Sequence, residues 1–376
     1  MLILTSTPYH LQFSLIQTFC LKRILSFVVY RGIIQRRGTT ASFLLGWGVI
    51  VPFSMAFPFW LIRVFGIENC ILRLSLSTVP TMGIFRTIEA MCNTSPIPIV
   101  ETSREHYSMY WSSLHHFEWM TTGSGKKIRK KIQLDELLRN TMDLILTFTL
   151  LSLLLSAALY CNFQPFPSSV DLLSFAFQPA QLFAPAHLAN SYCSVVVVYY
   201  ALKFLFELDA WKSQVGDGVV TKPVFRRPLW ASTGPRDFWS RRWNLMIHRI
   251  LKHGVYHPIS ASTGTKTSAA LLATFVASGL LHELSWQLMG IGIPGKLTAF
   301  FLWNGVLVGL EPLVIGPVLR FLLHHKCPVW IVSTLVVLLA MPVAHYYTGD
   351  WAWGGVLDDL KLGLWTIRPR QTVSSQ

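Results

Sequence analysis

Long apolar runs are the feature that most restricts how this chain can fold. A helix needs about 20 mostly apolar residues to cross a bilayer. The sequence contains five clear runs of that length and a sixth that carries a single acidic residue, Glu311. The clear runs are 43–62, 142–161, 188–206, 267–289 and 329–347, the sixth is 297–319, and two weaker ones are 11–30 and 71–85. We therefore predict an all-α, polytopic integral membrane protein with about 6 to 8 transmembrane helices.

The composition agrees with a membrane protein and disfavours a nucleic-acid-binding one. Hydrophobic residues make up 52% of the 376 residues and charged residues only 13%, whereas soluble domains carry about 25% charged residues. A net charge of +14 would suit a nucleic-acid-binding protein only if a soluble scaffold carried the basic residues. We expect no nucleic acid as a partner, and we attribute the charge to basic loops that face the cytosol and anionic lipids.

The cysteines and histidines do not predict a metal site or a permanently bound cofactor. The six cysteines are scattered without a C-x-x-C pair, so we expect reduced, buried thiols and neither a disulfide framework nor a zinc site. His248, His253 and His257 have spacings that invite a metal interpretation, but Gly254 and Pro258 interrupt their helix. No carboxylate or cysteine nearby completes a ligand set, so we predict no metal.

The distribution of Lys and Arg among the loops predicts the orientation in the membrane. The segment KKIRKK at 126–131 and the loop 207–266 are rich in Lys and Arg, whereas the loop 162–187 contains neither. Because basic loops stay preferentially in the cytosol, we place the first two there and the loop 162–187 in the lumen. No repeat of 20 to 50 residues is present. We therefore expect a single membrane domain, located in the endoplasmic reticulum.

The apolar run 267–289 contains two ionisable residues side by side, His282 and Glu283. At a rise of about 1.5 Å per residue, His282 lies roughly 22 Å into a helix that crosses a core about 30 Å thick. Ionisable residues at this depth normally face a bundle interior or a wet cavity and mark functional sites. The alternative is that a neutral His282 holds a neighbouring helix by a hydrogen bond. Adjacent residues point about 100° apart, so the two side chains are expected to have different roles.

A second notable stretch, GPRDFWSRRWNLMIHRILKHGVYHP at 234–258, alternates cations with aromatic and aliphatic residues. Taken alone, this pattern is typical of an amphipathic helix at the cytosolic headgroup level. A functional interpretation is that its cations attract a polyanionic substrate while Asn244 is delivered to the membrane core. Both interpretations are compatible with the sequence.

These two stretches resemble the wax synthase-like family within the membrane-bound O-acyltransferases. RDFWSRRWN, which ends in Asn244, is similar to the aromatic block of that family, and SGLLHEL is similar to the block that contains its active-site histidine, here His282. Upstream, FRTIEAMCNTSP resembles fungal members that acetylate terpenoid hydroxyls. The resemblance implies a helical bundle with a buried reaction tunnel. It divides the chain into N-terminal membrane helices at 1–90 and an acyltransferase region at 91–376.

The resemblance also implies an activity, the transfer of an acyl group from acyl-CoA to an alcohol. His282 would act as the general base, and Asn244 would stabilise the oxyanion that forms at the thioester. The residues expected to bind acyl-CoA are Arg236, Trp239, Arg241, Arg242 and Trp243. The residues expected to line the substrate tunnel are Glu283, Asn304 and Glu311.

Three functions remain open at the level of the sequence. The first is an acetyltransferase that uses acetyl-CoA as co-substrate and a hydroxyl of a terpenoid-type secondary metabolite as acceptor. The second is a wax ester synthase that joins a long-chain acyl-CoA to a fatty alcohol. The third, from a different class, is a proton-coupled transporter in which His282 and Glu283 relay protons. The partners common to both enzymes are acyl-CoA, a lipophilic alcohol and membrane lipids.

The predicted topology can be tested by labelling single cysteines in a cysteine-free background. We expect cysteines placed in 126–131 or 226–249 to react with a membrane-impermeant maleimide on the cytosolic side of sealed microsomes, because these basic segments remain in the cytosol. Cysteines placed in 162–187 should be protected. Labelling of 162–187 from the cytosolic side would reverse this topology.

Overall fold

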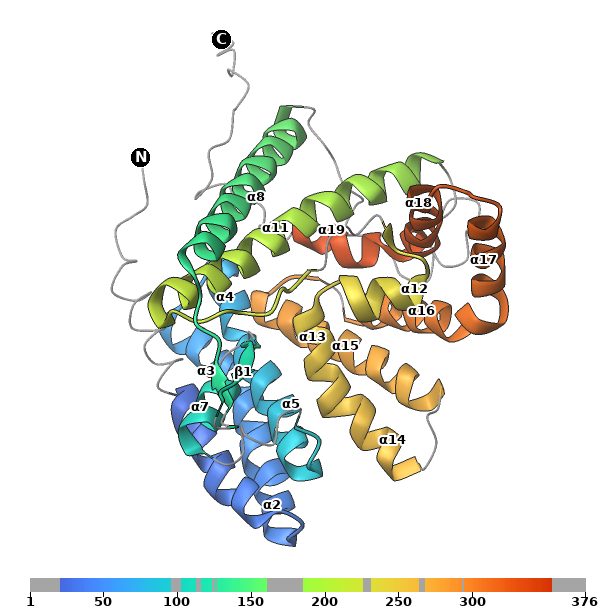
Figure 1. Ribbon diagram of the computed structural model, residues 1–376. Coiled ribbons are helices and arrows are strands. Elements are labelled where there is room, and N and C mark those ends of the chain that lie inside the picture. Colours follow the sequence, from blue (N-terminus) through green and yellow to red (C-terminus); the bar gives the residue numbers. More distant parts are fainter. Residues whose placement is uncertain are drawn as a thin grey trace. The chain divides into compact units, whose positions relative to one another are not determined.

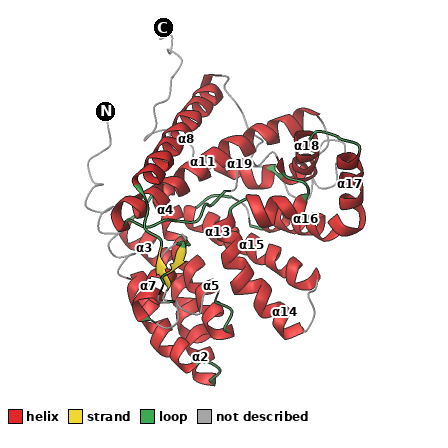
Figure 2. Ribbon diagram, in the orientation of Figure 1, coloured by secondary structure: helices red, strands yellow, loops and turns green. Residues whose placement is uncertain are grey.

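The computed structural model describes residues 21–95, 103–112, 116–123, 125, 127–160, 185–225, 231–263, 268–292 and 294–353. Within these ranges the chain is almost entirely helical, with one small two-stranded sheet (Figures 1 and 2). The all-α prediction is therefore confirmed. The start of the weak run 11–30, part of the basic segment at 126 and most of the loop 162–187 lie outside the described residues.

The chain forms two compact units, each built from two separate stretches of sequence. The first unit comprises Met1–His116 and Arg226–Val332, and the second comprises Phe117–Phe225 and Ser333–Gln376. Both stretches that were selected as functional candidates, around Asn244 and around His282, belong to the first unit. The candidate site therefore lies within the first unit.

The N-terminal half of the first unit is a set of short and long helices. After a helix described over 21–32, the elements are η1 (Ile34–Arg36), α2 (Thr40–Leu45), η2 (Gly46–Ile50), α3 (Val51–Phe65), α4 (Cys70–Leu76), α5 (Thr78–Cys92) and α7 (Arg104–Ser112). Helix α3 ends at Gly66, whose φ of 57° is the left-handed conformation that glycine adopts without strain. Helix α5 ends in the same conformation at Asn93.

The second half of the first unit contains both candidate stretches. Its elements are α12 (Pro235–Asp237), η4 (Phe238–Arg242), α13 (Leu245–Leu251), η5 (Lys252–Tyr256), α14 (His257–Thr263), α15 (Ser268–Met289), α16 (Lys296–Leu310), η6 (Glu311–Ile315) and α17 (Gly316–His324). The turns η4, η5 and η6 are π-helical. Such π-helical turns are rare and frequently occur at functional sites.

The second unit is built around two long helices. Strands β1 (Trp119–Thr121) and β2 (Lys127–Arg129) pair in antiparallel fashion, and α8 (Leu134–Tyr160) packs against α11 (Pro185–Asp217). Within α11, Lys203 Nζ lies 2.7 Å from Glu207 Oε2, and Thr147 Oγ1 of α8 donates a hydrogen bond of 2.8 Å to the same oxygen. The C-terminal elements are α18 (Val329–Ala340), of which residues 333–340 belong to this unit, η7 (Met341–Val343) and α19 (His345–Trp353).

Four of the described helical segments are long and apolar enough to cross a membrane: Thr40–Phe65, Leu134–Ala158, Ser268–Met289 and Lys296–His324. They correspond to the predicted runs 43–62, 142–161, 267–289 and 297–319. The predicted run 188–206 lies within α11, which is not one of these four. The run 329–347 is divided into α18, η7 and α19, because Pro342 cannot continue an α-helical hydrogen-bond ladder.

The four described cysteines, Cys70, Cys92, Cys193 and Cys327, are not joined by disulfides. The expectation that they are buried was wrong. Cys92 and Cys193 are exposed, and Cys70 and Cys327 are half-buried. Cys70, Cys92 and Cys193 lie in α4, α5 and α11, and Cys327 lies in the connection between α17 and α18.

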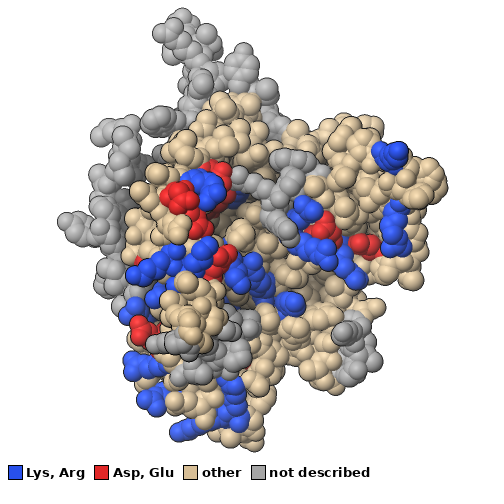
Figure 3. All heavy atoms as spheres, in the orientation of Figure 1, with Lys and Arg blue, Asp and Glu red and all other residues tan. Residues whose placement is uncertain are grey.

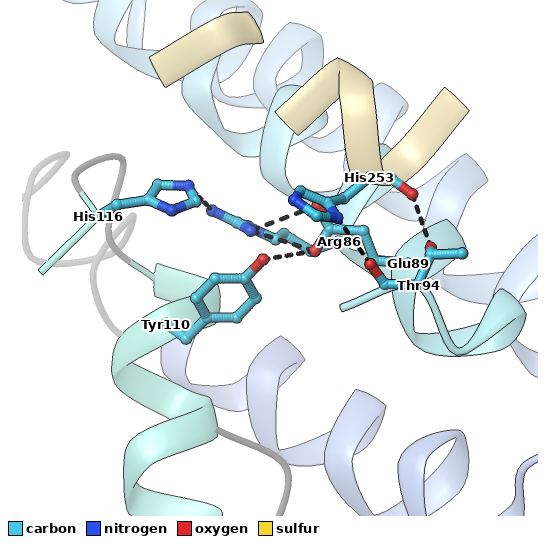
Figure 4. Close-up of polar contacts among 6 residues, drawn as sticks. All are labelled: Arg86, Glu89, Thr94, Tyr110, His116 and His253. Atoms are coloured by element: carbon cyan, nitrogen blue, oxygen red, sulfur yellow. Dashed lines mark hydrogen bonds and ion pairs between the residues drawn. The ribbon is translucent and has the colours of Figure 1, made fainter. Parts of the chain in front are cut away.

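A buried ionic cluster holds the N-terminal helices of the first unit together (Figure 4). Arg86, 1% exposed, pairs with Glu89, 0% exposed, at 3.1 Å between Nη1 and Oε2. The Tyr110 hydroxyl donates a hydrogen bond of 2.7 Å to the same Glu89 oxygen, and the Arg86 guanidinium lies 3.7 Å from the centre of the Tyr110 ring. Arg86 Nη2 donates to His116 Nε2 at 3.3 Å. Because buried charges are costly unless paired, this cluster fixes α5 against α7 and His116.

Helices α15 and α16 approach each other closely at two glycines. A Cβ atom at Gly279 would lie 2.6 Å from Thr298 Cα, and one at Gly305 would lie 2.9 Å from Phe275 Cβ. Small residues at such crossings allow membrane helices to pack backbone against backbone. The two glycines therefore determine how near α16 can come to the helix that carries His282.

We predict that Gly279→Ala destabilises the protein by about 1 to 3 kcal/mol, because the added methyl group must push the Thr298 backbone away. Thermal unfolding of purified protein in detergent measures the effect. Gly309→Ala is the matched control, since Gly309 lies in α16 with no atom within 4 Å of an added Cβ. Equal melting temperatures for the two variants would contradict the proposed close approach.

Candidate active site

The aromatic block before Asn244 packs onto the pair formed by α15 and α16. The Trp239 indole Nε1–H donates a hydrogen bond of 3.1 Å to Asn304 Oδ1 on α16. Its ring centre lies 5.9 Å from that of Phe275 on α15, and 6.2 and 5.8 Å from those of Phe300 and Phe301 on α16. One residue from the predicted acyl-CoA-binding set thus lies against one from the predicted tunnel set.

His282 is oriented by a hydrogen bond within its own helix. Its Nδ1 lies 2.7 Å from the carbonyl oxygen of Ser278, one turn earlier in α15. Because a carbonyl oxygen only accepts, Nδ1 carries the proton and, in the neutral ring, the lone pair lies on Nε2. The imidazole is half-buried, and its ring centre lies 4.5 Å from that of Phe301 and 6.1 Å from that of Trp286. This is the tautomer that a general base acting through Nε2 requires.

Phe301 is the residue that links the two candidate stretches. Its ring contacts both Trp239 of the aromatic block and His282 of α15, and it is 4% exposed. Phe301 is not among the site residues predicted from the sequence. A usable signal was present, since Phe301 precedes Asn304 by three residues and therefore shares its helical face.

Asn244 caps a helix in an unusual backbone conformation. Its φ of 36° and ψ of 62° are left-handed, and its Oδ1 accepts a hydrogen bond of 3.3 Å from the backbone N–H of Ile247 at the start of α13. Non-glycine residues in this conformation are uncommon, and Asn is among those that tolerate it best. With its oxygen used as a helix cap, the amide NH₂ remains the donor of the side chain. Within the described residues Asn244 makes this bond in its own segment and none with His282.

The carboxylates of the two glutamates of the predicted tunnel set accept hydrogen bonds from backbone N–H groups at the starts of other helical segments. Glu283 Oε1 accepts hydrogen bonds of 2.9 and 3.0 Å from the backbone N–H groups of Gly295 and Thr298 at the N-terminus of α16. Glu311 Oε2 accepts one of 2.5 Å from the backbone N–H of Arg236 in α12. A carboxylate at a helix N-terminus satisfies otherwise unpaired N–H groups. The tunnel-lining role of both residues stays a prediction, as does that of Asn304.

The predicted acyl-CoA-binding residues divide into two groups. Arg236 and Arg241 are exposed, and Figure 3 shows cationic side chains on the surface over α12. The side chains of the other three residues contact other parts of the protein. Arg242 pairs with Asp237 at 2.7 Å, Trp243 stacks on Phe238 with ring centres 5.5 Å apart, and Trp239 bonds to Asn304.

The histidines that follow Asn244 lie in a cationic environment. The pKa of His248 is lowered to about 4 by burial and by the nearby charges of Lys252 and Arg249. The pKa of His253 is also lowered to about 4, mainly by burial and further by neighbouring cations, although a hydrogen bond to Thr94 opposes the shift. Both rings are therefore neutral near pH 7. Over the described part of the chain no three His, Cys, Asp or Glu side chains are grouped to hold a metal ion.

The turn that carries His253 is clamped to the end of α5. Thr94 Oγ1 donates a hydrogen bond of 2.6 Å to the carbonyl oxygen of His253, and His253 Nδ1–H donates one of 2.9 Å to the carbonyl oxygen of Thr94 (Figure 4). A Cβ atom at Gly254 would lie 2.9 Å from Phe85 Cβ, so glycine permits this contact. Helix α5 thus supports the segment that follows Asn244.

Comparison with known proteins places both candidate residues in one family region. Residues 221–303, which include Asn244 and His282, match the model of the membrane bound O-acyl transferase family. The chain is 38% identical over 101 residues to the probable long-chain-alcohol O-fatty-acyltransferase 9 of Arabidopsis thaliana, covering 25% of this chain and 29% of the relative.

Two further relatives have related names. The acyl-CoA--sterol O-acyltransferase 1 of Arabidopsis thaliana is 38% identical over 120 residues, covering 30% of this chain and 34% of the relative. The long-chain-alcohol O-fatty-acyltransferase of Simmondsia chinensis is 34% identical over 104 residues, covering 26% of this chain and 29% of the relative. The matches span about a third of the length of these relatives.

The resemblance to wax synthase-like enzymes is thereby confirmed, while the closer resemblance to fungal terpenoid acetyltransferases stays a prediction. The segment that holds both Asn244 and His282 matches the membrane bound O-acyl transferase family over residues 221–303.

Proposed function

We propose that this protein is an integral membrane O-acyltransferase that transfers an acyl group from acyl-CoA to the hydroxyl of a lipophilic alcohol. The observation that carries the proposal is the His282 ring, held on a membrane helix with its proton on Nδ1, within the region that matches the acyltransferase family. The names of the relatives, which include long-chain-alcohol and sterol O-acyltransferases, support this class of reaction.

In the proposed reaction His282 acts first as a base and then as an acid. Nε2 takes the proton of the alcohol as the hydroxyl oxygen attacks the thioester carbonyl carbon. The tetrahedral intermediate then expels the CoA sulfur, which receives the same proton from Nε2. Throughout, the carbonyl oxygen of Ser278 accepts from Nδ1–H and stabilises the positive charge on the ring. Ester and free CoA are the products, so no further reactant is needed.

Asn244 is proposed to stabilise the negative charge that develops on the thioester oxygen. A donor that is already oriented loses little free energy by reorganisation when charge develops. Its left-handed backbone and its capping bond to Ile247 hold the side chain in place. The amide NH₂ is the group that would bind the oxyanion.

The phosphates of acyl-CoA are proposed to bind at the basic surface formed by α12, η4 and the following helix. Arg236 and Arg241 are exposed there, and Lys252 and Arg249 contribute positive charge near His248. Guanidinium groups form strong, charge-assisted hydrogen bonds with phosphate. The alcohol, which dissolves in the bilayer, would enter between membrane helices.

A more specific proposal names the two substrates of the enzyme and the membrane in which it lies. We infer an acetyl-CoA-dependent enzyme that acts on a terpenoid-type hydroxyl in the endoplasmic reticulum, with wax ester synthesis from long-chain acyl-CoA and a fatty alcohol as the alternative. The transporter interpretation loses support, because it gives no role to a region of an acyltransferase family. Assays with acetyl-CoA and long-chain acyl-CoA against a panel of terpenoid, sterol and fatty alcohols distinguish the two enzyme activities.

We predict that His282→Ala lowers acyl transfer by about 10² to 10⁴, the usual contribution of a general base. The measurement is ester formation from labelled acyl-CoA in membranes that contain equal amounts of each variant. His324→Ala is the control, since His324 is an exposed histidine of the same unit at the end of α17. Retained transfer by His282→Ala would disprove the mechanism. Loss of the protein itself would favour the structural interpretation of His282.

We also predict that Arg236→Gln combined with Arg241→Gln raises the KM for acyl-CoA by about tenfold or more, while the KM for the alcohol changes little. The physical reason is that these cations would contact phosphates and not the acceptor. Arg31→Gln is the control, because Arg31 is exposed but lies in the N-terminal helix. Equal increases in both KM values would indicate a structural amphipathic helix.

A further inference from the structure

We propose that Trp239 and Asn304 form a positioning pair that sets the place of His282 relative to the segment that ends in Asn244. This inference rests on the proposed function, since it assigns a role within the same reaction. Neither residue needs to contact the reacting atoms. The effect is transmitted through the ring of Phe301.

The orientation of the Asn304 amide is fully determined by its contacts. The side chain is 1% exposed. Its Nδ2 donates a hydrogen bond of 2.9 Å to the carbonyl oxygen of Phe300, which leaves Oδ1 to accept the Trp239 indole N–H at 3.1 Å. A buried amide without both bonds would cost free energy. Asn304 therefore presents its oxygen to Trp239 and to no other segment among the described residues.

The hydrogen bond in turn fixes the plane of the Trp239 ring. The indole lies nearly perpendicular to Phe275, at 85°, and at 69° and 58° to Phe300 and Phe301. Edge-to-face packing of this kind depends on ring orientation. Without the bond from Nε1–H to Asn304, the large indole could rotate, and its contact with Phe301 would change.

Phe301 links the orientation of the Trp239 ring to the position of His282, because its ring contacts both. Its ring centre lies 5.8 Å from that of Trp239 and 4.5 Å from that of His282, at 33° to the imidazole plane. Along the chain, Trp239 lies five residues before Asn244. The hydrogen bond between Trp239 and Asn304 therefore connects the segment that ends in Asn244 to α16. Helix α16 in turn packs against α15, which carries His282. A displacement of reacting groups of about 1 Å can lower a rate by about 100-fold.

A purely structural role and a positioning role predict different kinetics. If the pair only stabilised the fold, its loss would reduce the amount of protein and leave the remaining molecules with normal turnover. If the pair positions His282, kcat falls in molecules that remain folded while the KM for acyl-CoA changes little. Because Trp239 and Asn304 share one hydrogen bond, replacing both residues should then lower kcat no further than replacing either one.

The test compares Trp239→Phe, Asn304→Leu and the double variant in membranes that contain equal amounts of protein. We expect each single variant to lower kcat by about tenfold with the KM for acyl-CoA within about twofold, and the double variant to fall no further. Trp303→Phe is the matched control, since Trp303 lies in the same helix with 36% of its side chain exposed. Independent losses that multiply in the double variant, or unchanged kcat in either single variant, would overturn the proposal.

A second readout separates this proposal from the proposed function. If neither the wild-type protein nor any variant transfers acyl groups from acetyl-CoA or long-chain acyl-CoA, the proposed function fails. The pair is then judged by the melting temperatures in detergent of the wild-type protein, the two single variants and the double variant. Strictly additive shifts would show that Trp239 and Asn304 are not coupled and would overturn the pair itself. Non-additive shifts without any activity would reject its catalytic role.

Discussion

The close approach of α15 and α16 is the constraint on which the candidate site depends. In a bilayer, apolar side chains gain little by leaving lipid for protein, so helices associate where their backbones can come near. Gly279 and Gly305 supply that contact. Glu283 strengthens it by accepting the backbone N–H groups of Gly295 and Thr298 at the start of α16. Only with α16 at this distance does Phe301 reach the ring of His282.

The region that matches the acyltransferase family packs against helices that lie outside the match. Upstream of residue 221, α5 holds the turn η5 through the reciprocal hydrogen bonds of Thr94 and His253. Arg73 of α4 donates to the carbonyl oxygen of Met289 at the end of α15 at 3.0 Å. The buried pair of Arg86 and Glu89 in turn fixes α5 against α7. Helices outside the family match thus support both ends of the segment between Asn244 and His282.

The proposed reaction agrees with the positions of the residues to which it assigns a role. A lipophilic alcohol reaches a histidine on a membrane helix directly from the bilayer, whereas acyl-CoA is polyanionic and requires cations at the aqueous surface. The structure has exposed Arg236 and Arg241 on the segment that leads to Asn244. It also has cations beside His248 and His253, whose lowered pKa values keep both rings neutral. In the proposed reaction, the opposite requirements of the two substrates account for a site that combines a basic surface segment with an apolar helix.

The sequence by itself determined the helical class, the four membrane-capable helices of the described residues and the two stretches that carry His282 and Asn244. These properties are local, because hydropathy over 20 residues and the spacing of polar side chains within one segment can be read along the chain. The ends of the apolar runs 188–206 and 329–347 were less well predicted. There, α11 continues into charged residues and Pro342 interrupts the second run.

Only the tertiary structure decided which side chains from different segments meet. Trp239, which is predicted to bind acyl-CoA, donates a hydrogen bond to Asn304, and Phe301, which was not among the predicted residues, contacts the rings of both Trp239 and His282. The carboxylate of Glu283, a residue that is predicted to line the tunnel, caps the N-terminus of α16. Such contacts depend on how closely two helices approach and how they are rotated about their axes. Hydropathy does not encode either quantity, since lipid and a neighbouring helix are equally apolar surroundings for the same run of residues.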